Sequence, residues 1–205
     1  MTAASRILTD HRDTRARFPR DYALAHAEAI VDALVPYCDR IEIAGSIRRG
    51  RRDPKDIEIV AQPKRMAHAN LLGEPEVTFG DLNEGIRAYC ARERHPLTLR
   101  RVNPCASQPD GYHLDGPRFK ALQVGADSIP VDLFIVLPPA QWGSIFFIRT
   151  GPHDWNVRAI ARATKLGLRH IGGHLERDGK PLDTPEEIDV FRALRSPWVE
   201  PEDRK

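Results

Sequence analysis

The chain has 205 residues, of which 29% are charged and 41% apolar, as in a soluble protein with one domain or two small ones. It contains no run of about 18 apolar residues and no apolar signal core near its N-terminus, which excludes a membrane span and argues against secretion. The formal net charge of +2 is too small to indicate a nucleic-acid ligand by itself.

The cysteines indicate the cellular compartment. There are three of them, Cys38, Cys90 and Cys105, and they are widely spaced and form no CxxC pair. An odd number without a paired motif argues against a disulfide framework. We therefore expect a reducing cytoplasm.

The N-terminal region is predicted to be an arm followed by a helix. Residues 1–17 are polar and basic and are expected to form a loose arm. Pro19 and Asp21 favour the start of a helix, because proline fits the first helical position and an acid suits the first turn. Apolar residues then recur at helical spacing, so the helix should extend to about Val35.

A predicted strand–turn–strand unit comes next. The apolar strand Ile41–Ala44 leads into a turn at Gly45 and Ser46, and a second apolar strand carries Asp56 and Glu58. Alternate residues of a strand point to the same face, so these two acids project together. They repel each other unless a cation lies between them, and Mg²⁺ binds carboxylate and phosphate oxygens. Because the turn offers N–H groups and a hydroxyl to phosphate, the unit indicates metal-dependent phosphoryl or nucleotidyl transfer.

The remaining elements follow from apolar periodicity and turn residues. Residues 63 to about 78 give no clear period, and residues 104–117 are rich in Gly, Pro, Ser and Asp and are expected to be loop. Helices are predicted at about 82–89, 142–147, 154–166 and 184–194, the last with Thr184 as its N-cap, and a hairpin is predicted at 118–124 and 130–136.

A third carboxylate, Asp132, lies within an apolar predicted strand, Val131–Val136. Such a position is costly unless the carboxylate is paired or bound to a metal. If this strand lies beside the strand of Asp56 and Glu58, three carboxylates converge as ligands for two metal ions about 3.5–4 Å apart. The alternative is an edge-strand Asp that pairs with Lys120 or with an arginine.

Arginines follow the Gly-Ser turn. Arg49, in preference to Arg48, is expected to bind a triphosphate and to neutralise charge on the leaving pyrophosphate. Arg51 and Arg52 fit a solvated basic loop.

A second basic group follows Thr150. Arg158, Arg162, Lys165 and Arg169 recur at i, i+4, i+7 and i+11, and are predicted to form one stripe on the helix after Gly151. Such a stripe can follow a phosphate backbone, while a solvated helix face is the alternative. No acidic i+4 partners are interleaved, which favours DNA.

The histidines and tryptophans receive plainer interpretations. His170 and His174 have a spacing found in metal sites, but no third ligand is evident and Gly172–Gly173 lies between them. We interpret them as surface loop histidines. Trp142, Trp155 and Trp198 are interpreted as packing residues.

Several of these segments together resemble the family X DNA polymerases, the DNA polymerase beta group. The resemblance covers about residues 18–62 and 115–205, while residues 63–114 match poorly. The matching segments are Gly45–Gly50, Asp56–Glu58 and Val131–Leu133 in the palm, Thr150–Gly151 and Asn156–Arg158 at the nucleotide pocket, and Pro197–Arg204 at the close of the thumb.

The resemblance implies an α+β fold, with a nucleotidyltransferase palm whose mixed sheet is flanked by helices and a small C-terminal α/β thumb. We expect an arm at 1–17, a palm at 18–140 with an insertion at 63–114, and a thumb at 141–205. The implied activity is template-directed DNA polymerisation for short-gap filling in repair. In that reaction, the primer 3′-hydroxyl attacks the α-phosphate in line and pyrophosphate leaves.

The resemblance also implies roles for individual residues. Asp56 and Glu58 would bridge two Mg²⁺ ions, with Mn²⁺ as a substitute, and Asp132 would hold the catalytic ion near the primer hydroxyl. The implied nucleotide-binding residues are Gly45, Ser46, Arg49, Gly151 and Asn156. Arg158 would reach the template side, and it completes the DNA-binding set predicted from the basic stripe, with Arg162, Lys165 and Arg169.

The implied partners are a dNTP and a primer-template or gapped duplex, bound by a monomer in the cytoplasm of a bacterial or a phage- or virus-infected cell. Two positions depart from the family pattern. Glu58 stands where Asp is usual, which moves the carboxylate by about 1.5 Å, and Ile148-Arg149 replace an aromatic pair beside the sugar. The alternatives are transfer to tRNA, protein or a small molecule, untemplated addition, and a non-catalytic DNA-binding protein.

Overall fold

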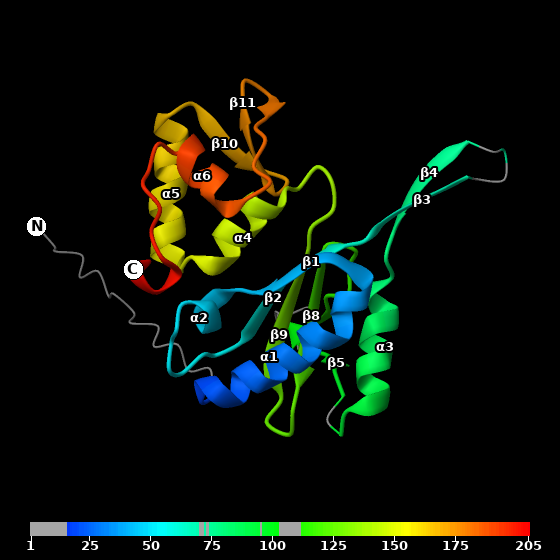
Figure 1. The fold of residues 1–205 in the computed structure, drawn as a ribbon. Helices are drawn as coiled ribbons and strands as arrows, with labels where there is room; N and C mark the ends of the chain where they lie inside the picture. The colour runs from blue at the N-terminus through cyan, green and yellow to red at the C-terminus, as the bar shows by residue number, and fades with distance from the viewer. Residues whose placement is uncertain (1–15, 70–71, 73, 95, 103–111) are drawn as a thin grey trace, which may run out of the picture.

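The computed structural model describes residues 16–69, 72, 74–94, 96–102 and 112–205. A mixed sheet with helices on both faces forms one part of the molecule, and a smaller C-terminal unit of helices and short strands lies beside it (Figure 1). Among the described residues, no helix combines the length and the apolar character that crossing a membrane requires.

The helices and strands have the following bounds. The helices are α1 (Arg20–Leu34), α2 (Gly45–Arg48), α3 (Leu82–Arg92), α4 (Trp142–Thr150), α5 (His153–Lys165) and α6 (Glu187–Ala193), with 3₁₀ turns at Val35–Tyr37 and Pro201–Asp203. The strands are β1 (Cys38–Ile43), β2 (Ile57–Pro63), β3 (Arg65–Ala69), β4 (Pro75–Phe79), β5 (Thr98–Leu99), β6 (Arg101–Val102), β7 (Tyr112–His113), β8 (Phe119–Val124), β9 (Ile129–Ile135), β10 (Leu168–Ile171), β11 (His174–Arg177) and β12 (Lys180–Pro181).

The main sheet has the strand order β1-β2-β9-β8-β5. Strand β2 is antiparallel to β1 but parallel to β9, and β9 is antiparallel to β8. The β2–β9 pair places Glu58 opposite Asp132. The central strands are thus the ones that carry the acids, which is the arrangement expected if the predicted strands adjoin.

Alternation along β2 and β9 divides the sheet into two apolar faces. On one face, Ile57, Ile59, Val131 and Leu133 pack with residues of α1 and α3 in the largest core. On the other face, Val60, Phe134 and Val136 pack with Trp142 and Phe146 of α4. Glu58 and Asp132 lie on this second face, two residues before Val60 and Phe134, which contact α4.

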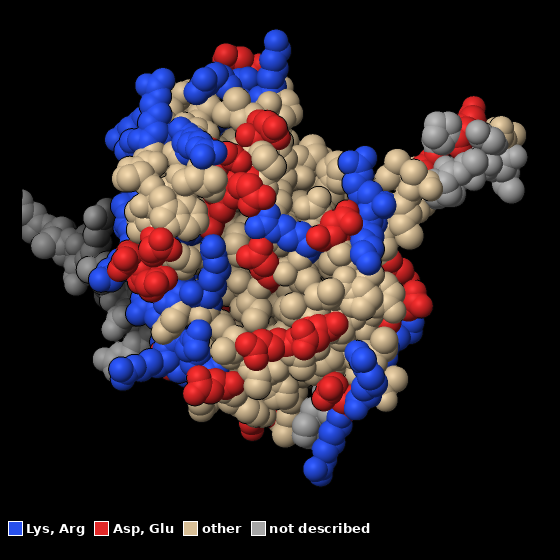
Figure 2. Space-filling view, viewed as in Figure 1, with Lys and Arg blue, Asp and Glu red and all other residues tan. Residues whose placement is uncertain are grey.

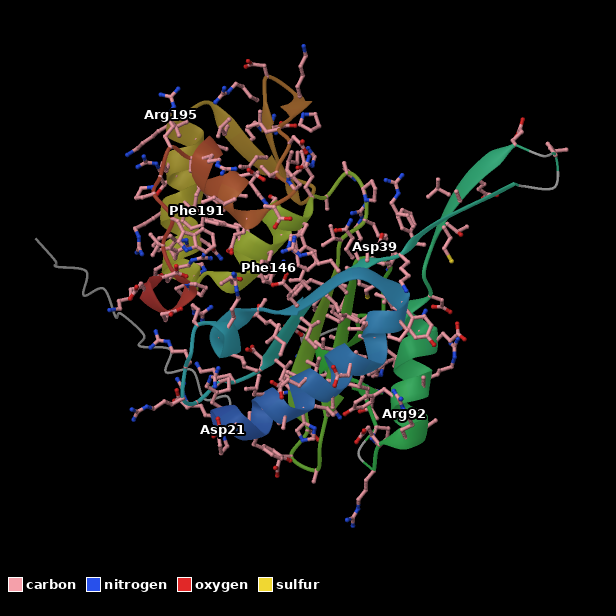
Figure 3. The ribbon with its side chains drawn as sticks, in the orientation of Figure 1. Asp21, Asp39, Arg92, Phe146, Phe191 and Arg195 are labelled. Carbon is pink, nitrogen blue, oxygen red and sulfur yellow. The ribbon has the colours of Figure 1, made fainter. Side chains whose placement is uncertain are left out.

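Helix α4 joins the sheet to the C-terminal unit. Phe146 packs toward the sheet, whereas its neighbour Phe147 belongs to the core of the C-terminal unit, with Phe191, Leu168 and Leu175. Figure 3 shows Phe146 beside the sheet and Phe191 within the unit. The unit contains α5, α6 and the antiparallel sheet β10-β11-β12. Because one helix serves both cores, the start of the C-terminal unit is fixed against the sheet face that carries the acids.

Most elements predicted from periodicity are confirmed, including α1, α3, α4, α5 and the β8–β9 hairpin. Gly45 and Ser46 open a short helix, α2, rather than a simple turn. The predicted cap of the last helix is wrong. Helix α6 begins at Glu187, and Glu186 and Asp189 form its capping box, while Thr184 instead bonds the side chain of Gln141.

The interpretation of His170 and His174 as surface loop residues is also wrong. They lie on the neighbouring strands β10 and β11, and His174 is buried. Burial lowers the pKa of His170, and the nearby His174 and Arg149 act in the same direction.

The poorly patterned region that begins at residue 63 contains strands β3 and β4, which pair as a two-stranded ribbon that projects from the body of the molecule (Figure 1). The predicted arm lies largely outside the described residues, as does much of the loop predicted at 104–117. Arg17, at the end of the arm, forms an ion pair with Asp53.

Candidate functional site

Two of the three predicted acids occupy matching positions on adjoining strands. Glu58 and Asp132 are paired residues of the parallel strands β2 and β9, so their side chains leave the same face of the sheet. Asp56 lies just before β2, which begins at Ile57, rather than within the strand as predicted. The topology brings together acids that are more than 70 positions apart in the chain.

Glu58 is the most perturbed carboxyl of the group. Burial raises its pKa to about 8, and the negative charges of Asp56 and Asp132 contribute in the same direction. Arg149 and Arg49 oppose the increase. The negative charges near Glu58 thus outweigh the positive charges of its two arginines, which favours binding of a further cation.

Asp132 is held by an arginine that the sequence did not single out. It forms an ion pair with Arg100, which also donates to the carbonyl of Leu122. Burial raises the pKa of Asp132, and Arg100 opposes that rise. The pairing matches part of the structural alternative, but β9 is a central strand and not an edge. The sequence does not predict this role of Arg100, because its segment has no periodicity that places it against β9.

A polar cavity of about 500 Å³ brings the other predicted residues together. Ser46 and Arg49 of the turn line it with Asp56, Glu58 and Gly151. Arg17, Arg51, Lys55 and His153 are further lining residues. The predicted phosphate turn, the acid pair and the start of the C-terminal unit thus share one water-accessible space. Arg51 and Arg52 are exposed on a loop, as predicted, and Arg51 also lines this cavity.

Three of the predicted nucleotide-binding residues carry buried polar atoms with no hydrogen-bond partner among the described residues. These atoms are Ser46 Oγ, Arg49 Nε and Asn156 Oδ1. Buried polar groups are normally satisfied, so each such atom requires an explanation. Ser46 and Arg49 line the cavity, so a phosphate-bearing ligand there would supply partners for their two atoms, whereas Asn156 lies beside the lining residue Gly151.

Arg49 also joins the turn to the C-terminal unit, because it donates to the carbonyl of Thr150. Burial lowers the pKa of this guanidinium, and Glu58 acts against that change. Asn156 of α5 donates to the carbonyl of Ile148 at 2.7 Å, at the end of α4. A Cβ on Gly151 would lie 2.5 Å from Asn156 Oδ1, so only glycine lets this side chain approach.

An ionic network reinforces the same junction. Arg48 donates to Thr150 Oγ1 at 2.6 Å and to Glu187 of α6 at 2.8 Å. Glu187 also accepts from Arg204, whose side chain is fully buried near the rings of Phe191 and Trp198. The sequence did not identify this network, since Glu187 and Arg204 lie in segments interpreted by apolar pattern or by resemblance.

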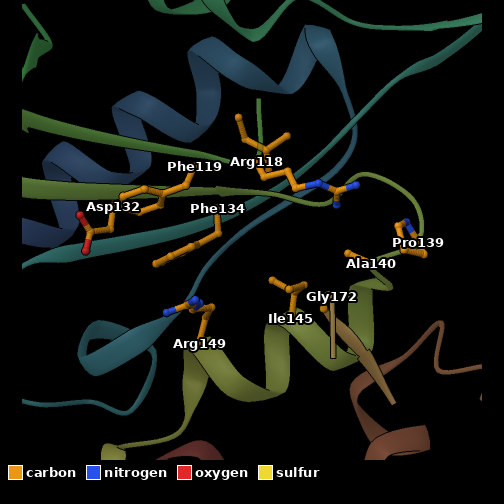
Figure 4. A pocket seen from close by; sticks show the side chains of 11 residues that line it. Arg118, Phe119, Asp132, Phe134, Pro139, Ala140, Ile145, Arg149 and Gly172 are labelled. Carbon is orange, nitrogen blue, oxygen red and sulfur yellow. The ribbon is translucent and has the colours of Figure 1, made fainter. Parts of the chain in front are cut away.

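A second, more apolar cavity of about 650 Å³ lies on the other side of the acids. Asp132 and Arg149 line it together with Phe119 and Phe134 (Figure 4). Arg149 extends from the last turn of α4, and its guanidinium stacks 3.8 Å from the centroid of the Phe134 ring. Asp132 therefore faces one cavity, while Asp56 and Glu58 face the other.

The predicted basic stripe is partly wrong. Arg158, Arg162 and Lys165 lie exposed on α5, but Arg169 lies on β10, where it pairs with Glu176 at 3.4 Å. Figure 2 shows Lys and Arg side chains gathered along its left side, where α5 and α2 lie in Figure 1.

Two members of the stripe also bind backbone. Arg162 donates to the carbonyls of Leu194 and Arg195 at the end of α6, and Arg158 donates to the carbonyl of Lys205. Both residues therefore support the C-terminal unit itself, and Lys165 is the member best suited to report on DNA alone.

The donor types fit a divalent metal, but the side chains are not arranged as a ligand set. Within the described ranges, no group of three or more His, Cys, Asp or Glu side chains is placed to hold a metal ion. Asp132 is turned to Arg100. Carboxylates on one sheet face beside an unsatisfied hydroxyl are the oxygen donors that Mg²⁺ prefers. Binding would require Asp132 to reorient.

Comparison with known families identifies the C-terminal part. Residues 147–205 match the family model described as DNA polymerase beta thumb. No curated protein gives a significant match to the chain. The C-terminal part is therefore similar to a family X polymerase thumb, which implies an interaction with DNA. The match includes Gly151, Asn156 and the basic residues of α5, while Ser46 and the three acids lie outside it.

Proposed function

We propose that this protein is a template-directed DNA polymerase that adds a nucleotide to a primer 3′-hydroxyl and fills short gaps during DNA repair. One observation carries the proposal. The cavity of about 500 Å³ joins Ser46, Arg49, Asp56 and Glu58 to Gly151, within a segment that matches a polymerase thumb. A nucleotide bound there would contact the acids and the thumb at the same time.

The roles follow from the chemistry of each side chain. Ser46 Oγ and Arg49 Nε would bind the β and γ phosphates, because both are buried without a partner in the described part of the chain. Gly151 would approach the sugar, and Asn156 would contact the base. Holding the triphosphate in this way positions the α-phosphate for in-line attack and leaves pyrophosphate as the departing group.

Asp56, Glu58 and Asp132 would hold two Mg²⁺ ions, or Mn²⁺ in their place. When bound, these ions would neutralise phosphate charge and favour deprotonation of the primer hydroxyl. Asp132 would lie on the side of the acceptor, since it faces the cavity opposite the phosphate-binding residues. The exposed basic residues of α5 would bind the DNA backbone.

The proposal is tested by primer extension on a gapped duplex with one labelled nucleotide at a time. We expect addition of the nucleotide that pairs with the template base, only with Mg²⁺ or Mn²⁺ present, and loss of addition in Asp56→Asn. The matched control, Asp39→Asn, changes an exposed acid on β1 away from both cavities and should extend normally.

The acceptor and the role of the template are read from the same experiment. Extension of a single-stranded primer, with no preference among the nucleotides, would indicate untemplated addition. DNA binding without addition to any primer would contradict polymerase activity and favour a DNA-binding protein or transfer to a different acceptor.

A further inference from the structure

Arg149 lies where it bears directly on the acids. It occupies the last turn of α4, and its guanidinium stacks on Phe134, which is two residues beyond Asp132 on the same strand face. Arg149 and Asp132 line the same cavity, and Figure 4 shows Arg149 extending from α4 toward the strand that carries Asp132. Glu58 is the paired neighbour of Asp132 on the adjoining strand, and the charge of Arg149 interacts with both carboxyls.

The charges of these three residues are mutually dependent. Burial lowers the pKa of Arg149, while Glu58 and Asp132 favour its charged form. In return, Arg149 lowers the pKa of both carboxyls against the effect of their burial. A guanidinium remains charged in proteins, so it acts here as a permanent positive charge in a partly desolvated space.

The way Arg149 is held differs from that of its neighbours. Its Nε atom is buried and has no hydrogen-bond partner among the described residues. By contrast, Arg100 is bonded to Asp132 and Leu122, and Arg118 to the carbonyls of Leu137 and Pro138. Arg149 is thus held by a ring contact and by charge attraction. Its displacement would break no hydrogen bond at Nε.

We propose that Arg149 is an internal counter-cation of the Glu58–Asp132 pair, and that a divalent metal ion competes with this guanidinium for the pair. This inference rests on the proposed metal-dependent function, and it concerns how readily the acids accept an ion. Two cations in the same low-dielectric space repel each other, so the guanidinium weakens metal binding in the nucleotide-free protein. Arg149 is thus a positioning residue that raises the metal concentration the protein requires, in addition to the direct pairing of Asp132 with Arg100.

The test uses Mn²⁺ as the probe and requires no catalysis. Free Mn²⁺ is measured by electron paramagnetic resonance during titration of the full chain without DNA or nucleotide, at the same pH for every variant. We expect Arg149→Met to bind Mn²⁺ on the order of tenfold more tightly than the unmodified protein, because one opposing charge is removed. Arg149→Lys, which retains the charge, should stay close to the unmodified protein.

The control is Arg118→Met, which removes a positive charge from the far end of the same cavity. It should leave Mn²⁺ affinity unchanged. If Arg149→Met does not fold, as judged by circular dichroism, Arg149→Gln provides the same neutralisation with a polar side chain and the same expected tightening.

The outcomes separate this inference from the proposed function. Equal or weaker Mn²⁺ binding in the folded neutral variant, with binding intact in the unmodified protein, would overturn the counter-cation while leaving the metal site. No Mn²⁺ binding in either protein would overturn the inference, while primer extension in Mg²⁺ decides the proposed function separately. Binding that appears only in the neutral variant supports the inference, because the site is then present and blocked by Arg149.

Discussion

The carboxylate of Glu58 lies directly over Gly45. A Cβ placed on Gly45 would stand 2.0 Å from Glu58 Oε2. Gly45 also has a φ of +63°, which residues other than glycine rarely adopt. The turn and the acid strand therefore fit together through the absence of a side chain. The longer side chain of Glu58, in place of the Asp usual in the family it resembles, reaches the turn that would hold the phosphates.

This contact predicts the effect of Gly45→Ala. The new methyl group would displace the Glu58 carboxylate, and a misplacement of about 1 Å can reduce a rate about 100-fold. We expect that loss in single-nucleotide incorporation, together with about 1–2 kcal/mol of lost stability from backbone strain. Single-turnover kinetics and chemical denaturation measure the two effects separately.

Gly50→Ala is the matched control for that variant. Gly50 has a similar φ of +70°, but nothing lies within 4 Å of its Cβ position. It should lose comparable stability and keep most of its activity. An equal loss of activity in both variants would show that backbone strain in the loop, rather than the Glu58 contact, controls the rate.

The raised pKa of Glu58 predicts a pH effect on the metal-free protein. Its folded pKa of about 8 lies above the ordinary value of 4.5, so the folded state binds the proton more tightly than the unfolded state. This contribution to stability is complete below pH 4.5 and is lost as pH rises to about 8. Thermal unfolding of Glu58→Gln in chelator should lack that part of the decline, and identical pH profiles for both proteins would contradict the assignment.

The buried pair of Glu187 and Arg204 predicts a stability effect. Their side chains are only 6% and 0% exposed, and removing one partner of such a pair typically costs about 3–5 kcal/mol. We expect a loss of that size in Arg204→Met, measured by denaturant unfolding. Arg192→Met breaks an exposed pair with Asp189 and should change stability by less than about 1 kcal/mol. Similar losses of stability in the two variants would show that the buried Glu187–Arg204 pair does not make the large contribution to the stability of the C-terminal unit that is expected here.

The thumb match and the exposed cations of α5 predict DNA binding through Lys165. Charge reversal in Lys165→Glu should weaken binding to a gapped duplex about tenfold and reduce the slope of affinity against salt by roughly one. Arg92→Glu, on α3 away from α5, is the control and should bind as the unmodified protein does (Figure 3). Fluorescence anisotropy over a salt series measures the affinity of both variants. If Lys165→Glu binds DNA as tightly as the unmodified protein, this face of α5 is a solvated surface that does not contact DNA.

Much of the fold was predictable because its signals are local. The helical signals of α1 and α5 and the apolar run of β9 each lie within one segment, and their elements are confirmed. The adjacency of Glu58 and Asp132 could be stated only as a condition, because strand order depends on contacts distant in sequence. The structure satisfies that condition through the parallel pairing of β2 and β9.

What the sequence could not supply are the partners of charged side chains. The ion pair of Asp132 with Arg100 joins two segments, and no sequence pattern indicates that these segments are in contact. The spacing of Arg158 and Arg162 predicted a free helix face, but their guanidinium groups bind the carbonyls of Lys205 and Leu194. Helical spacing also extended the stripe to Arg169, although Gly167 had already ended the helix.

The most direct test of the central claim is nucleotide incorporation by Asp132→Asn on a gapped duplex in Mg²⁺. Asn has nearly the same shape as Asp but lacks the charge needed for a divalent ion. The account predicts a loss of at least about 1000-fold in rate, with unfolding midpoint and DNA affinity nearly unchanged. Turnover within a few-fold of the unmodified protein would contradict it, because the paired carboxylates of β2 and β9 would then not form the reaction centre.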